Sequence, residues 1–182
     1  MEPLEILSYE VCGIKWAMKA LRLPKESYSD SLFKPGYVGP KDAVLSSNFV
    51  ATGHKRSELT RGIVVWLEIK FHVSWLIHLQ TYFHGVECLG SSKGLDKELH
   101  DIREKFISFD HREKFISFGQ PDKMYKRILT INYAALRRMY MTRRFYSRQD
   151  FNIFCNWIET LPYFQQLIYP EYGKEKDENN MG

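Results

Sequence analysis

The segment from Ile63 to Val73 limits the possible folds of this chain more than any other part of the sequence. Every second side chain along it is apolar: Ile63, Val65, Leu67, Ile69, Phe71 and Val73. The side chains between them become polar along the segment and include Glu68, Lys70 and His72. A period of two residues predicts a β-strand with one buried face. We therefore expect a sheet with helices packed on it.

Apolar residues at helical spacing predict helices on both sides of this strand. The expected helices span about residues 10–21, 40–53, 74–83, 95–106, 130–145 and 149–161. Ser147–Asp150 resembles a capping box at the start of the last one. At 182 residues the chain suits one domain, which we place at 1–172, followed by a disordered polar tail at 173–182. The expected fold class is α/β (α+β), with a mixed sheet packed against several amphipathic helices.

One internal repeat interrupts this pattern. The seven residues 103–109 recur unchanged at 112–118, at an offset of nine. Nine residues turn the second copy to the opposite face of a helix or a strand, so the repeat cannot extend one buried surface. We interpret it as a local duplication within a connection.

Composition and single-residue counts exclude several classes of protein. The chain is 44% hydrophobic and 15% aromatic, which predicts a packed core and excludes a disordered or fibrous chain. Three widely spaced cysteines do not form a disulfide framework or a zinc motif. The six histidines lack metal-ligand spacing. Without a signal peptide or an apolar membrane span, we expect a cytoplasmic protein.

The positive charge is concentrated in one segment. Between Lys123 and Arg148 there are eight Lys or Arg residues, whereas the net charge of the whole chain is only +4. This segment is either a solvated helix face or an interaction surface. Tyr125, Tyr133 and Tyr140 lie among the cations and would be available to stack on bases, which leaves a nucleic-acid-binding protein as one alternative.

Arg143 departs from the rest of that segment. At 100° per residue it shares a helix face with Asn132, Leu136 and Met139, the face that should point to the interior. A guanidinium there needs an anionic partner, because an unpaired buried charge is costly. The partner is either an anionic ligand or an internal carboxylate.

Ser91-Ser92-Lys93 is the second candidate for anion binding. These residues stand just before a predicted helix, where hydroxyls, backbone amides and an ammonium group can hold an anion. A turn with a helix cap explains the same residues, so the sequence does not decide between an anion site and a structural turn.

Two stretches of the chain resemble the flavin-dependent thymidylate synthases. In that family a Gly-His pair leads through a strand and a helix to Arg-His-Arg, followed by a motif that contains Ser-x-Arg. Here Gly53-His54 leads through the strand at 63–73 to Thr81-Tyr82-Phe83 at the Arg-His-Arg position, and Ser91-Ser92-Lys93 takes the Ser-x-Arg position. The family's Asn-Ala-Arg helix is similar to the segment that starts at Asn132, with Arg143 on its terminal arginine.

The resemblance implies a site and a reaction. Ser91, Lys93 and Arg143 would bind the substrate deoxyuridylate (dUMP), and Asn132 and His54 would bind flavin (FAD). The family transfers a one-carbon unit from methylenetetrahydrofolate to dUMP with FAD and NADPH, in homotetramers whose sites lie between subunits. It requires no protein nucleophile, so the lack of a catalytic Cys or Ser motif is compatible with the resemblance, and we name no catalytic side chain.

The leading hypothesis is therefore a divergent thymidylate synthase-like methyltransferase that acts on a pyrimidine deoxynucleotide. The alternative is a non-catalytic nucleotide-binding relative, because Thr81, Tyr82 and Phe83 lack the charge that would face the flavin phosphates. The nucleic-acid-binding protein ranks last.

Overall fold

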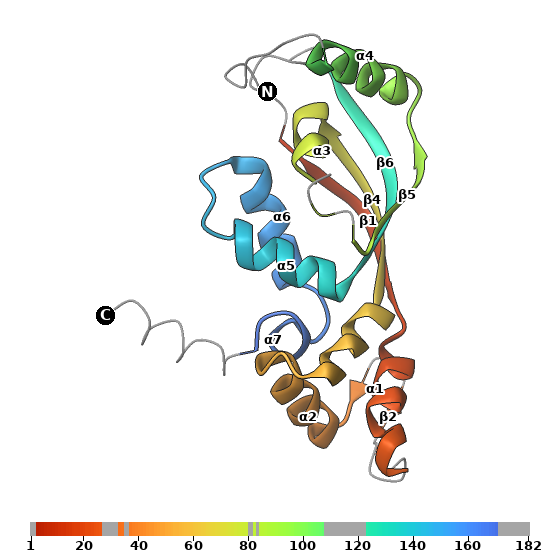
Figure 1. Ribbon diagram of the computed structural model, residues 1–182, viewed down its shortest axis with the longest axis vertical. Helices are drawn as coiled ribbons and strands as arrows, with labels where there is room; N and C mark the ends of the chain where they lie inside the picture. Colours follow the sequence, from red (N-terminus) through yellow and green to blue (C-terminus); the bar gives the residue numbers. More distant parts are fainter. Residues whose placement is uncertain are drawn as a thin grey trace, which may run out of the picture.

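The computed structural model describes residues 3–26, 33–34, 37–79, 82, 84–107 and 123–170. Its centre is a four-stranded sheet in the order β1 (Glu5–Cys12), β4 (Val64–His72), β6 (Met124–Asn132), β5 (Val86–Ser91). Helices pack on the sheet, which confirms the expected α/β class (Figure 1). Each pairing between these strands is antiparallel, so the expectation of a mixed sheet is wrong.

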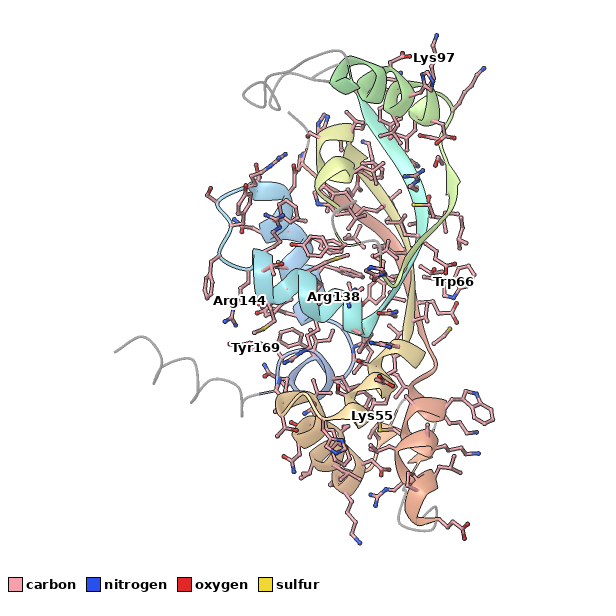
Figure 2. All side chains as sticks on the ribbon, in the orientation of Figure 1. Lys55, Trp66, Lys97, Arg138, Arg144 and Tyr169 are labelled. Atoms are coloured by element: carbon pink, nitrogen blue, oxygen red, sulfur yellow. The ribbon has the colours of Figure 1, made fainter. Side chains whose placement is uncertain are left out.

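Strand β4 is the strand predicted from the alternation, and it lies in the middle of the sheet. Val65, Leu67, Ile69 and Phe71 are buried on the side that the helices cover. On the opposite side Trp66 is 47% exposed and points away from the helices (Figure 2). The apolar face therefore holds the core, as the sequence predicts.

Three strands of the four-stranded sheet were not predicted. The segment at 10–21 is not helical throughout, because β1 continues to Cys12 and helix α1 (Ile14–Arg22) begins after Gly13. Strand β5 lies between the helices expected at 74–83 and 95–106, where we predicted no regular element. Strand β6 lies within the basic segment, where the buried side chains Leu129 and Ile131 alternate with exposed or half-buried ones.

A glycine contact joins α1 to the sheet. Gly13 has φ +92°, and a Cβ at this position would lie 2.1 Å from the carbonyl oxygen of Gly62. Only glycine suits both the left-handed backbone and the close approach. This contact fixes α1 beside the 3-10 helix η3 (Lys55–Gly62).

The lower part of the molecule in Figure 1 consists of short elements around α1. The elements are η1 (Leu23–Lys25), β2 (Phe33–Lys34), β3 (Tyr37–Val38), α2 (Pro40–Ala51), η3 and α7 (Phe164–Leu167). The helix predicted to start at Pro40 is confirmed. Proline at the first helical position fits because the nitrogen there needs no hydrogen.

The remaining helices include α3 (Val73–Leu79), α4 (Leu95–Ile107), α5 (Tyr133–Arg143) and α6 (Gln149–Glu159). Helices α5 and α6 lie on one side of the sheet, and α4 lies at its end (Figure 1). The predicted apolar stripe of α6 is buried, with Phe154 packed on Trp75 and Trp157. None of the helices in the described residues is long and apolar enough to cross a membrane.

The expected capping box at the start of α6 is wrong. Arg148 occupies the N-cap position and its side chain makes no capping hydrogen bond. Asp150 instead accepts a hydrogen bond from the Leu4 backbone N–H at 3.3 Å and lies 3.6 Å from Arg148. The acidic side chain thus ties the N-terminus to α6. The second copy of the repeat and the tail at 173–182 lie outside the described residues.

Candidate functional site

The predicted site residue Asn132 sets the start of α5. It is the N-cap of that helix, with extended backbone angles, and its Oδ1 accepts a hydrogen bond from the Ala135 N–H at 2.8 Å. Its own N–H donates to the carbonyl of Gly85 at 2.9 Å. Gly85 has φ +88°, and a Cβ there would lie 2.3 Å from Asn132 Nδ2. Asn132 therefore holds α5 against the turn that contains Gly85.

Arg143 lies at the last turn of α5, on the face that the sequence indicates. Leu136 and Met139 on that face are buried, and Arg143 is half-buried. Its Nε donates to Tyr82 Oη at 2.8 Å. Its Cζ lies 5.6, 4.9 and 5.2 Å from the ring centroids of Tyr82, Tyr146 and Phe151.

The side-chain partners of Arg143 are therefore a neutral hydroxyl and three rings. No carboxylate pairs with it among the described residues. A guanidinium has five N–H donors, and only the one on Nε is engaged. Its two terminal nitrogens hold four donors that have no partner in the described part of the chain, so the positive charge is not neutralised there.

A pocket of about 400 Å³ lies beside Tyr82. We call it the Tyr82 pocket, and its walls are Tyr82, His84, Arg137, Arg138, Met141 and Thr142. Two of these side chains are cationic and none is acidic. The pocket thus offers positive charge beside apolar surface, which suits a ligand with an anionic group and a ring.

The backbone of neighbouring segments holds both arginines of this pocket. Arg137 Nη1 donates to the Ile168 carbonyl at 2.7 Å, and burial lowers the pKa of its guanidinium. Arg138 Nη2 donates to the His84 carbonyl. Figure 2 shows Arg138 on α5 and Arg144 at the C-cap of that helix, next to Tyr169. Because carbonyls are neutral, both side chains keep their full charge.

Ser91 and Lys93 lie apart from the Tyr82 pocket. Ser91 ends β5 and pairs with Arg127, five residues before Asn132 on β6, which is roughly 17 Å along the strand. Its hydroxyl accepts a hydrogen bond from Arg127 Nε at 2.8 Å. Lys93 is exposed and stands just before α4, at the end of the sheet. One copy of the chain does not bring these residues to Arg143.

His54 lines a second pocket, of about 350 Å³, between α1 and η3. The other walls are Ala20, Leu21, Lys55, Glu58 and Leu59. The imidazole packs on Phe49, with ring centroids 4.8 Å apart. Asn132 is not part of these walls, so the structure does not place the two predicted flavin residues together.

The three tyrosines that the sequence suggested for stacking on nucleic acid are buried. Tyr125, Tyr133 and Tyr140 are 1%, 0% and 6% exposed. They belong to the core, which removes the sequence argument for a nucleic-acid-binding surface. Among the described residues, no three His, Cys, Asp or Glu side chains gather to hold a metal ion.

Sequence reasoning missed Arg138, Thr142 and the role of Tyr82. Arg138 and Thr142 are four residues apart, which places them on one helix face, so the spacing carried a usable signal. Tyr82 gave no signal, because its contact with Arg143 joins residues that are 61 positions apart.

Comparison with known proteins supports the fold. The crystal structure of thymidylate synthase X (ThyX) from Helicobacter pylori with FAD and dUMP is similar, with a TM-score of 0.61 and 14% identity over 96% of this chain and 100% of that one. A second structure of the flavin-dependent enzyme from Helicobacter pylori, complexed with FAD and dUMP, gives 0.61 and 13% over 93% and 99%. No protein-family model and no curated sequence matches.

Proposed function

We propose that this chain is a thymidylate synthase-like protein that binds dUMP, with Arg143 holding the phosphate. The observation that carries the proposal is the guanidinium of Arg143, whose charge no carboxylate among the described residues compensates. Arg143 is not a wall of the Tyr82 pocket but contacts Tyr82, which is one. This charge occurs in a fold whose similar solved structures hold FAD and dUMP. These two facts are independent, because the charge of Arg143 follows from contacts within this chain alone.

The chemistry of the donors favours a phosphate over a carboxylate or a neutral ligand. A guanidinium presents two parallel N–H groups that match two oxygens of one phosphate. Arg138, on the wall of the Tyr82 pocket, adds a second cation on the same helix. The apolar walls formed by Tyr82 and Met141 suit a pyrimidine ring.

We assign part of the FAD to the pocket that His54 lines, whose one acidic wall, Glu58, would have to face away from the phosphates. Leu21 and Leu59 provide apolar surface, His54 provides a ring and Lys55 a cation for a phosphate. When bound, FAD would supply the redox chemistry with which a one-carbon unit from methylenetetrahydrofolate becomes a methyl group, at the expense of NADPH. Asn132 is committed to capping α5 through Oδ1, so only its Nδ2 remains for a cofactor.

We further propose that Ser91 and Lys93 complete the site from a second copy of the chain. They lie apart from Arg143 within one copy, and the family resemblance implies homotetramers with shared sites. A mixture of a Lys93→Ala chain with an Arg143→Gln chain tests this. If random pairing forms mixed dimers, roughly a quarter of the sites regain both residues. Failure of the mixture to recover any dUMP binding would refute the shared site.

The central experiment measures thermal stabilisation by dUMP, deoxycytidylate and FAD. A ligand that binds only the folded chain raises its melting temperature. We expect dUMP to stabilise the wild-type chain and the Arg143→Gln variant to lose this effect. The matched control is Arg61→Gln, since the Arg61 side chain is 66% exposed and its one ion pair among the described residues is with Glu58, at 3.8 Å. A wild-type chain that dUMP does not stabilise would overturn the proposal.

The sequence at residues 81–83 supports a second candidate function, nucleotide binding without catalysis. Thr81-Tyr82-Phe83 provides no cation where the family has Arg-His-Arg. In that case dUMP would bind but FAD would neither bind nor give the protein a flavin colour. Transfer of a labelled one-carbon unit to dUMP, in the presence of FAD and NADPH, separates the two functions.

A further inference from the structure

The hydroxyl of Tyr82 connects Arg143 to the backbone of α5. Tyr82 Oη lies 2.8 Å from Arg143 Nε and 2.6 Å from Thr142 Oγ1. Thr142 Oγ1 in turn lies 2.8 Å from the Arg138 carbonyl and 3.2 Å from the Met139 carbonyl. Three side chains thus form one chain of hydrogen bonds that ends on the helix.

The number of protons fixes the direction of each bond. A carbonyl only accepts, so the single hydroxyl proton of Thr142 points to the helix backbone. Thr142 Oγ1 must then accept from Tyr82, whose single proton is used in this bond. Tyr82 Oη is left as an acceptor, and Arg143 Nε can only donate to it. Each donor in the chain has one acceptor.

We propose that Tyr82 is a positioning residue that aims Arg143 at the anionic group of the ligand. The hydrogen bond engages Nε of Arg143. The two terminal nitrogens have no partner among the described residues and can donate to a phosphate. The rings of Tyr146 and Phe151, at 4.9 and 5.2 Å from Cζ, limit the swing of the guanidinium. A long side chain that is already fixed in place loses less conformational entropy when the ligand binds.

This inference rests on the proposed function and extends it to Tyr82, which stands where the family has a charged motif that this chain lacks. The family resemblance sets Tyr82 where a histidine would stand, so a role for a phenol there is particular to this chain. The neutrality of the phenol matters. A carboxylate at the same place would also fix Arg143, but it would cancel the charge that attracts a phosphate.

The test compares dUMP affinity in three variants by calorimetric titration. Tyr82→Phe removes the acceptor and keeps the ring, and we expect it to weaken dUMP binding roughly tenfold. Thr142→Val removes the acceptor of the Tyr82 proton and should weaken binding by a smaller factor, about threefold. Thr142→Ser keeps the hydroxyl and should restore wild-type affinity. Melting temperatures measured without ligand identify any variant that fails to fold.

A double-mutant comparison separates positioning from direct contact with the ligand. If Tyr82 acts through Arg143, then Tyr82→Phe has no further effect on dUMP affinity in a chain that already carries Arg143→Gln. A second full loss in that background would show that the Tyr82 hydroxyl acts on the ligand directly and not through Arg143, and it would overturn the inference. Unchanged affinity in the single Tyr82→Phe variant would also overturn it.

The failure of the proposed function gives a different result. A wild-type chain that binds inorganic phosphate through Arg143 but does not bind dUMP would refute nucleotide binding. The same variants would then be compared for their affinity for phosphate, and an unchanged affinity in Tyr82→Phe would overturn the positioning role. A wild-type chain that binds neither probe would overturn both proposals, because no anion would then need a positioned Arg143.

Discussion

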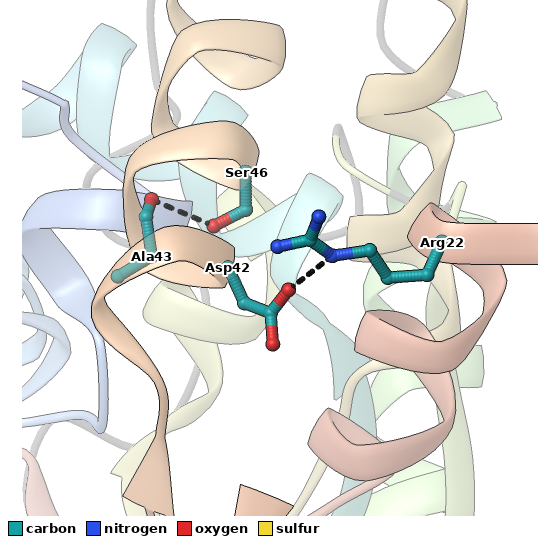
Figure 3. A network of polar contacts seen from close by, with 4 residues as sticks. All are labelled: Arg22, Asp42, Ala43 and Ser46. Carbon is teal, nitrogen blue, oxygen red and sulfur yellow. Dashed lines mark hydrogen bonds and ion pairs between the residues drawn. The ribbon is translucent and has the colours of Figure 1, made fainter. Parts of the chain in front are cut away.

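Arg22 and Arg143 both occupy the last position of a helix, but their side chains have different partners, a carboxylate for Arg22 and a neutral hydroxyl for Arg143. Arg22 ends α1 with only 10% of its side chain exposed, and its Nε donates at 2.6 Å to Oδ1 of Asp42, which is fully buried (Figure 3). Arg143 ends α5 with Nε on the neutral hydroxyl of Tyr82. A carboxylate of the chain neutralises the first arginine, whereas none of the described residues neutralises the second. A site for an external anion is therefore expected at the second.

The cost of burial explains why the two regions differ. The Arg22–Asp42 pair lies between α1 and α2, where a lone charge would be strongly destabilising. Arg143 is only half-buried, and the faces of three rings lower the cost of leaving its charge without an anion. The contrast separates an arginine that stabilises the fold from one that is available for function.

The largest effect that we predict follows from breaking the first pair. Asp42→Asn keeps the shape of the side chain but leaves Arg22 charged and buried without a counterion. We expect the free energy of unfolding to fall by about 3–5 kcal/mol, measured by urea denaturation. Replacing both residues by leucine should cost less than this single change. A loss below about 1 kcal/mol for Asp42→Asn would show that the pair does not carry the fold.

The sequence predicted the elements that bury an uninterrupted apolar face and missed those that charges interrupt. The alternation around Leu67 identified β4, and the spacing of Leu136 and Met139 identified α5. Strand β6 was not predicted, because Lys126 and Arg127 suggested a charged surface. Its conformation depends on pairing with β4 and β5. Pairing between distant strands is not a local property of the sequence.

The site was predicted in part for the same reason. Helix geometry alone placed Arg143 on the inner face of α5, because the positions of a helix follow from the spacing of its residues. Its partner Tyr82 lies across a tertiary contact and had no local signature. For Ser91 and Lys93, the missing information would be a second chain, which no single sequence contains.

Alkaline pH should destabilise the protein through the buried thiol of Cys155 on α6. Burial and the Glu159 carboxylate raise the pKa of the Cys155 thiol to about 11, from 9.0 in the unfolded chain. The folded state thus holds a proton that the unfolded state loses, so stability is complete below pH 9 and falls as the pH rises to 11.

The expected loss through Cys155 is on the order of 2 kcal/mol at pH 11. Urea midpoints measured from pH 8 to pH 11 would show it as a downward slope. Cys155→Ala should flatten that slope, and Cys88→Ala is the control because Cys88 is exposed. A slope that Cys155→Ala leaves unchanged would assign the alkaline sensitivity to other groups.

The smallest effect on stability is expected at Arg143, and it sharpens the comparison most. Arg143→Met keeps a long apolar side chain among Tyr82, Tyr146 and Phe151 and removes only the charge, so the unfolding free energy should change by about 1 kcal/mol or less. The same substitution at Arg22 leaves Asp42 buried beside an apolar chain and should cost about 3–5 kcal/mol. Urea denaturation of the two variants side by side measures the difference, and dUMP titration should show the reverse order, with binding lost only in Arg143→Met. Equal destabilisation by the two substitutions would mean that the charge of Arg143 is also structural, and the uncompensated guanidinium would then no longer indicate a ligand.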